Sequence, residues 1–140
     1  MRDAARLIHA ISTSALVLCV GLQVFLAGLA VFDDPAMFLT HATFGALILL
    51  VTIVVLVTAA VARAGRRQVG LAALTIVLML LQSIFVSVRA DQPAIAALHP
   101  VNGFLIGLIA VSMARAAWRV ARAPRVEEPA GLRAEGTATS

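Results

Sequence analysis

Two histidines stand at equivalent places in a pattern that the sequence contains twice. The two copies are Asp33-x-Pro35-x5-His41-x3-Gly45 and Asp91-x-Pro93-x5-His99-x3-Gly103. A duplicated unit of this kind tends to place like residues across a pseudo-two-fold axis. We therefore expect His41 and His99 to share one depth and to face each other. Two inward imidazoles at one level of a helix bundle can hold a b-type haem, as the axial ligands on the two faces of the iron.

The glycine of each copy fits this chemistry. Gly45 and Gly103 lie four residues beyond their histidines, and residues spaced by four share one face of a helix. A side chain at either position would strike a porphyrin held by the histidine, whereas glycine leaves a slot. The sequence therefore predicts that both glycines line the cofactor.

Other polar residues are predicted near the same level. A Leu-Gln pair precedes each copy, and it supplies Gln23 and Gln82, which could hydrogen-bond a ligand or each other. The distance from glutamine to aspartate differs by one residue between the copies. Arg89 could pair with haem propionates, and Asn102 could do the same.

Two other interpretations of the histidines stay open. They could be structural residues of a non-catalytic accessory or interaction subunit, because histidine is tolerated near helix ends in the interface and glycine is common in membrane helices. A copper or zinc site would join His41 and His99 to Asp33 or Asp91. Those aspartates resemble helix caps and lie two turns from the histidines. His9 has no histidine partner at its own depth and is predicted to be structural.

The elements that position these residues follow from composition. The chain has 140 residues, of which 61% are hydrophobic and 13% charged, with mean hydropathy +1.01. Four apolar stretches, at about 8–32, 36–62, 69–89 and 98–120, each reach the roughly 20 residues that a membrane-spanning helix needs. Short connections predict an all-α, up-down-up-down membrane four-helix bundle built from a duplicated two-helix unit.

The boundaries of the bundle also follow from the sequence. Asp33-Asp34-Pro35 reads as a cap with proline at the first helical position of the second span, and Asp91-Gln92-Pro93 opens a short outer helix or turn. The bundle is expected over residues 1–123. Residues 124–140 lose hydrophobic periodicity and are predicted to be a disordered cytoplasmic tail.

The arginines predict the orientation. They cluster before the first span, between the second and third, and after the fourth, whereas Arg89 stands alone on the other side. The positive-inside rule then places both termini in the cytoplasm and the two Asp-Pro loops outside, in the bacterial inner membrane. The high isoelectric point is thus explained by topology and does not indicate nucleic-acid binding.

The sequence resembles a family of small bacterial four-span membrane proteins of unknown function. The resemblance covers roughly residues 5–122 and is carried by Phe25-Leu26-Ala27-Gly28, by His41 with Gly45, and by Leu98-His99-Pro100-Val101-Asn102-Gly103. It implies the fold and no activity. The layout is also similar to cytochrome b561-like bundles, although the second histidine pair of those proteins is missing here.

The sequence thus predicts a small membrane b-type cytochrome with one haem near the outer face. It would act as an electron carrier, exchanging electrons with a quinone or a membrane redox partner, and would not be an enzyme by itself. Its lipid partner is the bilayer, and the oligomeric state, homo- or hetero-oligomeric, is left open.

Overall fold

A computed structural model describes residues 2–123, which form helices and short connections and contain no strand. Four long helices and one short helix follow one another in the order α1 (Arg2–Phe32), α2 (Met37–Val61), α3 (Arg66–Ser87), α4 (Pro93–Ala96) and α5 (Leu98–Ala121). The four long helices coincide with the four apolar stretches, so the predicted spans are confirmed. The predicted tail, 124–140, lies outside the described residues.

The predicted cap at the start of the second span differs from the structure. Pro35 does not occupy the first helical position of α2; it lies in a turn, and α2 begins at Met37. The carboxylate of Asp34 accepts a hydrogen bond from the backbone N–H of Ala36 at 2.9 Å, so it stabilises the turn and does not cap the helix. The short helix or turn predicted after Asp91 is present as the helix α4.

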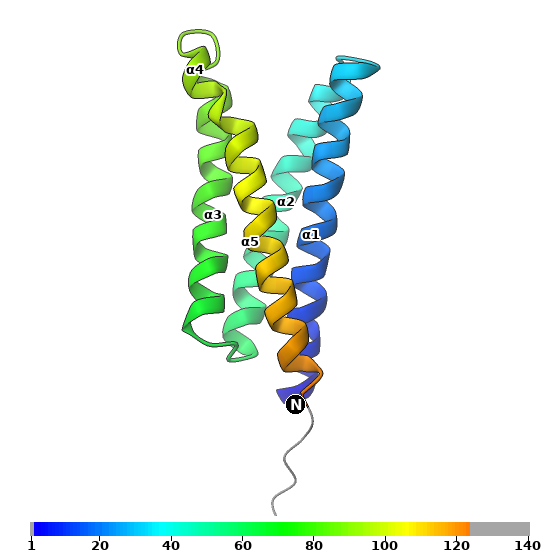
Figure 1. Cartoon of the computed structure of the whole chain (residues 1–140), viewed down its shortest axis with the longest axis vertical. Helices are drawn as coiled ribbons and strands as arrows, with labels where there is room; N and C mark the ends of the chain where they lie inside the picture. Colours follow the sequence, from blue (N-terminus) through cyan, green and yellow to red (C-terminus); the bar gives the residue numbers. More distant parts are fainter. Residues whose placement is uncertain (1, 124–140) are drawn as a thin grey trace, which may run out of the picture.

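Each long helix packs against two neighbours. The helix α1 contacts α2 and α5, and α3 contacts the same two helices, so α1 faces α3 and α2 faces α5 across the diagonals of the bundle. We call the end that holds residues 33–36 and 88–97 the distal end, and the end that holds the N-terminus of α1 and residues 62–65 the proximal end. Figure 1 shows that the hairpins α1–α2 and α3–α5 diverge toward the distal end.

The reversal at the proximal end depends on glycine. Gly65 precedes α3 with a φ of 91°, a left-handed conformation that side chains disfavour. The connection between α2 and α3 therefore uses a backbone conformation that glycine adopts without strain.

The interior is apolar but contains buried hydroxyls. Leu16, Ile48 and Met113 are among the fully buried side chains of the core. The hydroxyls of Thr52 and Thr75, both buried, donate to backbone carbonyls four residues earlier in their own helices. No polar partner on another helix is then required of these hydroxyls, which is how membrane helices accommodate threonine.

The outer surface of the bundle is also apolar. Leu39 is 76% exposed, Leu18 73% and Phe104 70%, an arrangement that would be unfavourable in water but suits contact with lipid chains. All four long helices are long and apolar enough to cross a membrane. The protein is a multi-pass, integral membrane four-helix bundle.

Candidate functional site

The two histidines of the repeat meet across a diagonal of the bundle. His41 lies in the first turns of α2 and His99 in the first turn of α5, both near the distal end. Their ring centroids are 6.1 Å apart and their planes are inclined by 56°. Because α2 and α5 do not pack directly against each other, the two side chains bridge the interior between the hairpins.

Hydrogen bonds to Gln23 of α1 orient the ring of His41. Its Nδ1 lies 3.1 Å from the backbone oxygen of Gln23, an atom that can only accept, so Nδ1 carries the proton. Its Nε2 then accepts from the side-chain amide of Gln23 at 3.1 Å. The same amide nitrogen donates to the backbone oxygen of His41 at 2.9 Å. One glutamine therefore sets both the tautomer and the orientation of this histidine.

The second copy repeats half of this arrangement. His99 Nδ1 donates to the backbone oxygen of Gln82 on α3, at 3.3 Å. The side chain of Gln82 turns elsewhere, because its Oε1 accepts from Asn102 Nδ2 at 2.9 Å. Asn102 also donates to the backbone oxygen of Leu78 at 2.8 Å. The histidine-to-glutamine backbone contact is thus common to both copies, and the side-chain contacts differ.

The two repeat glycines make room for the two repeat glutamines. A Cβ added to Gly45 would lie 3.1 Å from the side-chain nitrogen of Gln23, and one added to Gly103 would lie 3.2 Å from that of Gln82. Both distances are closer than ordinary van der Waals contact. In this structure the space beside each glycine therefore contains a glutamine amide, a contact that reasoning from single helices did not identify.

The copies differ most in how the glutamine oxygen is satisfied. Gln82 Oε1 has Asn102 as its donor, whereas Gln23 Oε1 is buried without a hydrogen-bond partner. The residue of the first copy that corresponds to Asn102 is Phe44, which packs against the core. A phenyl ring offers no donor, so the first copy retains one unsatisfied acceptor.

The other predicted site residues lie apart from the two histidines. Arg89 follows α3 in the distal connection; its guanidinium is exposed and donates to the backbone oxygen of Val86 at 3.3 Å. Asp33 and Asp91 are exposed in the distal connections. Within residues 2–123, no group of three or more His, Cys, Asp or Glu side chains lies close enough to bind a metal ion. A zinc or copper site would need ligands beyond this set.

His9 lies at the opposite end of the bundle and is buried. Its Nδ1 is 3.1 Å from the hydroxyl of Thr58, and that hydroxyl donates to the backbone oxygen of Val55, so the histidine donates and the hydroxyl accepts. A small cavity lies beside His9, and Gln68 on α3 also lines it. Sequence reasoning did not single out Gln68, because a glutamine beside a basic turn is ordinary for a helix end.

Comparison with known proteins covers part of this site. Residues 23–88 match a family of unknown function, DUF6220. The expected resemblance to such a family is therefore confirmed over this range, which contains Gln23, His41, Gly45 and Gln82. The second histidine, His99, and the stretch 98–103 that also carries the resemblance lie beyond the matched range. No curated protein and no solved structure matches the chain.

Proposed function

We propose that this membrane protein is a small b-type cytochrome that binds one haem between His41 and His99. The observation that carries the proposal is the distance of 6.1 Å between their ring centroids. With metal–nitrogen bonds of about 2 Å, two imidazoles on opposite sides of one metal have centroids roughly 6 Å apart. Haem iron bound in this way supplies one-electron transfer.

The hydrogen bonds of both histidines support the same role. A histidine that ligates a metal usually donates its other ring N–H to a carbonyl or carboxylate, which fixes the tautomer and the ring orientation. His41 and His99 both direct Nδ1 to the backbone oxygen of a glutamine on the preceding long helix. This leaves Nε2 of each ring as the ligand atom.

Binding also requires the two repeat glutamines to change partners. The amide of Gln23 must leave Nε2 of His41, and the amides of Gln23 and Gln82 must withdraw from the glycines that they cover. Glutamine side chains have rotatable bonds enough to do so without movement of a helix backbone. Gln23 Oε1, which has no partner in this structure, loses nothing by the change.

The proposal includes the orientation predicted from the arginines. Both termini lie in the cytoplasm, the distal end faces outward, and the haem lies near the outer face of the bacterial inner membrane. Arg89, which is also at the distal end, would neutralise a propionate, and a quinone or a membrane redox partner would exchange electrons with the haem.

An absorption spectrum tests the haem proposal directly. The full chain, purified in detergent from cells supplied with haem precursor, is expected to show a Soret band. His41→Ala and His99→Ala are expected to abolish the band, whereas His9→Ala, which removes the third histidine of the chain, retains it. A colourless wild-type protein, or bands that survive both distal substitutions, would overturn the proposal.

A specific observation favours a second candidate function, that of a non-catalytic accessory subunit with structural histidines. Gln23 already satisfies both ring nitrogens of His41 and covers Gly45, so this half of the site is complete without a ligand. In that case the wild-type protein is colourless, and His41→Ala still lowers the thermal midpoint because the inter-helix hydrogen bonds are lost. An unchanged midpoint together with a colourless protein would exclude both functions for His41.

A further inference from the structure

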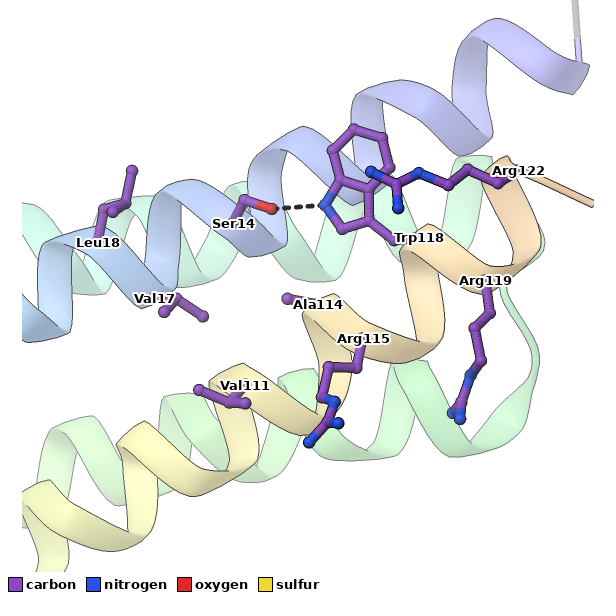
Figure 2. A pocket seen from close by; sticks show the side chains of 9 residues that line it. All are labelled: Ser14, Val17, Leu18, Val111, Ala114, Arg115, Trp118, Arg119 and Arg122. Carbon is purple, nitrogen blue, oxygen red and sulfur yellow. Dashed lines mark hydrogen bonds between the residues drawn. The ribbon is translucent and has the colours of Figure 1, made fainter.

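A groove of about 790 Å³ lies between α1 and α5 near the proximal end, on the side of the molecule away from the histidines. Figure 2 shows its lining side chains, which come from α1 and α5. The part nearer the middle of the bundle is apolar and is lined by Val17, Leu18 and Val111. The part nearer the helix ends is basic and is lined by Arg115, Arg119 and Arg122.

Helical spacing produces this change of character along α5. Val111, Arg115 and Arg119 follow one another at intervals of four residues and therefore share a face of the helix. Figure 2 shows that the side chains of Arg115 and Arg119 extend on the same side of α5. From the middle of the bundle toward the end of α5, this face therefore presents an apolar side chain first and then two guanidinium groups.

The wall of the groove is held in place by Trp118. Its indole Nε1 donates to the hydroxyl of Ser14 at 2.8 Å, and that hydroxyl donates to the backbone oxygen of Ala10 at 2.9 Å. The guanidinium of Arg122 lies 4.7 Å from the centre of the Trp118 ring, within cation–π distance. The indole thus ties α1 to α5 and positions one of the three cations (Figure 2).

Within the part of the chain that the structure describes, the arginines of the groove form no ion pair with a carboxylate. Among residues 2–123 the ion pair found is that of Arg6 with Asp3, at 4.0 Å, and no carboxylate pairs with Arg115, Arg119 or Arg122. Guanidinium groups bind phosphate well because their planar array of donors matches its oxygens. Clusters of basic residues between membrane helices accordingly attract anionic lipid headgroups.

We propose that this groove binds one anionic phospholipid. The phosphate contacts Arg115 and Arg119, and an acyl chain lies along Val17, Leu18 and Val111. A free phosphate would use the basic half alone and leave the apolar half unexplained, whereas a phospholipid uses both. The assignment does not depend on haem binding.

The single tryptophan of the chain makes the test specific to this groove. The full protein is reconstituted in phosphatidylcholine bilayers to which one brominated lipid is added, either phosphatidylglycerol or phosphatidylcholine. Bromine atoms on the acyl chains quench the fluorescence of a nearby indole. We expect the brominated phosphatidylglycerol to quench Trp118 with an apparent affinity at least about five-fold higher, because each arginine near a charged headgroup strengthens binding roughly that much.

Matched variants decide whether the groove causes the preference. Arg115→Gln combined with Arg119→Gln is expected to abolish the preference, so that brominated phosphatidylglycerol and brominated phosphatidylcholine quench Trp118 with equal apparent affinity. Arg63→Gln combined with Arg66→Gln removes the same charge from the same end of the protein, at the α2–α3 connection and the first residue of α3, and is expected to leave the preference unchanged. Equal losses in the two double variants would overturn the proposal, because general surface charge would then explain the preference.

Two further measurements exclude other occupants. Inorganic phosphate at millimolar concentration is expected not to relieve quenching by brominated phosphatidylglycerol; relief would identify an anion site and overturn the lipid assignment. A chain that ends at Ala123 lacks Glu127 and Glu128 and is expected to keep the wild-type preference. A preference that arises only in this shortened chain would show that the acidic segment occupies the groove, which also contradicts the proposal.

Discussion

Asn102 donates a hydrogen bond of 2.9 Å to Gln82 Oε1, whereas the corresponding oxygen of Gln23 is buried without a partner. The difference arises because Phe44 occupies the position in the first copy that Asn102 occupies in the second. One half of the duplicated unit is therefore a satisfied polar contact, and the other half retains an unsatisfied acceptor. Stability and ligand binding should accordingly respond differently to equivalent substitutions in the two halves.

Asn102→Leu is expected to destabilise the protein by about 1–2 kcal/mol, because it removes two inter-helix hydrogen bonds and leaves Gln82 Oε1 unpaired in the interior. Phe44→Leu is the matched control: it changes packing at the equivalent position and breaks no hydrogen bond. Thermal or denaturant unfolding in detergent measures both. A loss in Asn102→Leu no larger than that in Phe44→Leu would show that the asparagine contributes only its volume.

Gly103→Leu is expected to abolish the Soret band of haem-loaded protein while leaving the chain inserted in the membrane. Even a Cβ at this position lies 3.2 Å from the amide of Gln82, so a longer side chain must intrude on the space between the hairpins. Gly21→Leu is the control, because nothing lies within 4 Å of its added Cβ. Full haem occupancy in Gly103→Leu would exclude a cofactor beside this glycine.

The sequence predicted the four spans and the facing histidines for simple reasons. Apolar length alone decides whether a segment can cross a membrane, and the gap-free repeat requires His41 and His99 to lie at one depth in equivalent helices. The repeat alone does not decide whether the two helices that carry these histidines are adjacent or diagonal. The structure resolves it, since α2 and α5 lie across the bundle from each other.

Contacts between helices were not predictable from the sequence. The amide of Gln23 covers Gly45 because α1 and α2 pack in one register with one side-chain rotamer, and no spacing within a single helix contains that information. The groove at Arg115 and Arg119 could not be predicted from the sequence for another reason. Arginines at a cytoplasmic helix end are expected in any membrane protein, so a general topological rule already explained them.

Arg89→Ala is expected to lower the midpoint potential of the haem-loaded protein and to change its stability little. A nearby cation disfavours the ferric state, which carries one more positive charge than the ferrous state, so its removal favours oxidation. The side chain is exposed and, within residues 2–123, donates to the backbone oxygen of Val86, so its loss is expected to have a small structural effect. Spectroscopic redox titration measures the shift, with Arg63→Ala at the proximal end as the control. Equal potentials in both variants would argue against a propionate beside Arg89.

The hydrogen bond between His9 and Thr58 is expected to contribute to stability and not to cofactor binding. Thr58→Val removes the acceptor of His9 Nδ1, and inter-helix hydrogen bonds in membrane proteins contribute on average about 0.6 kcal/mol. His9→Leu removes the donor together with Nε2, a buried atom that has no partner. In the His9→Leu background, Thr58→Val should therefore have almost no further effect, and a double-mutant cycle on unfolding free energies measures this coupling. Because both residues lie near the proximal end, the Soret band should remain unchanged in all three variants. Additive losses of unfolding free energy would mean that the 3.1 Å contact contributes nothing to stability. Loss of the Soret band in these variants would indicate that the haem binds near His9.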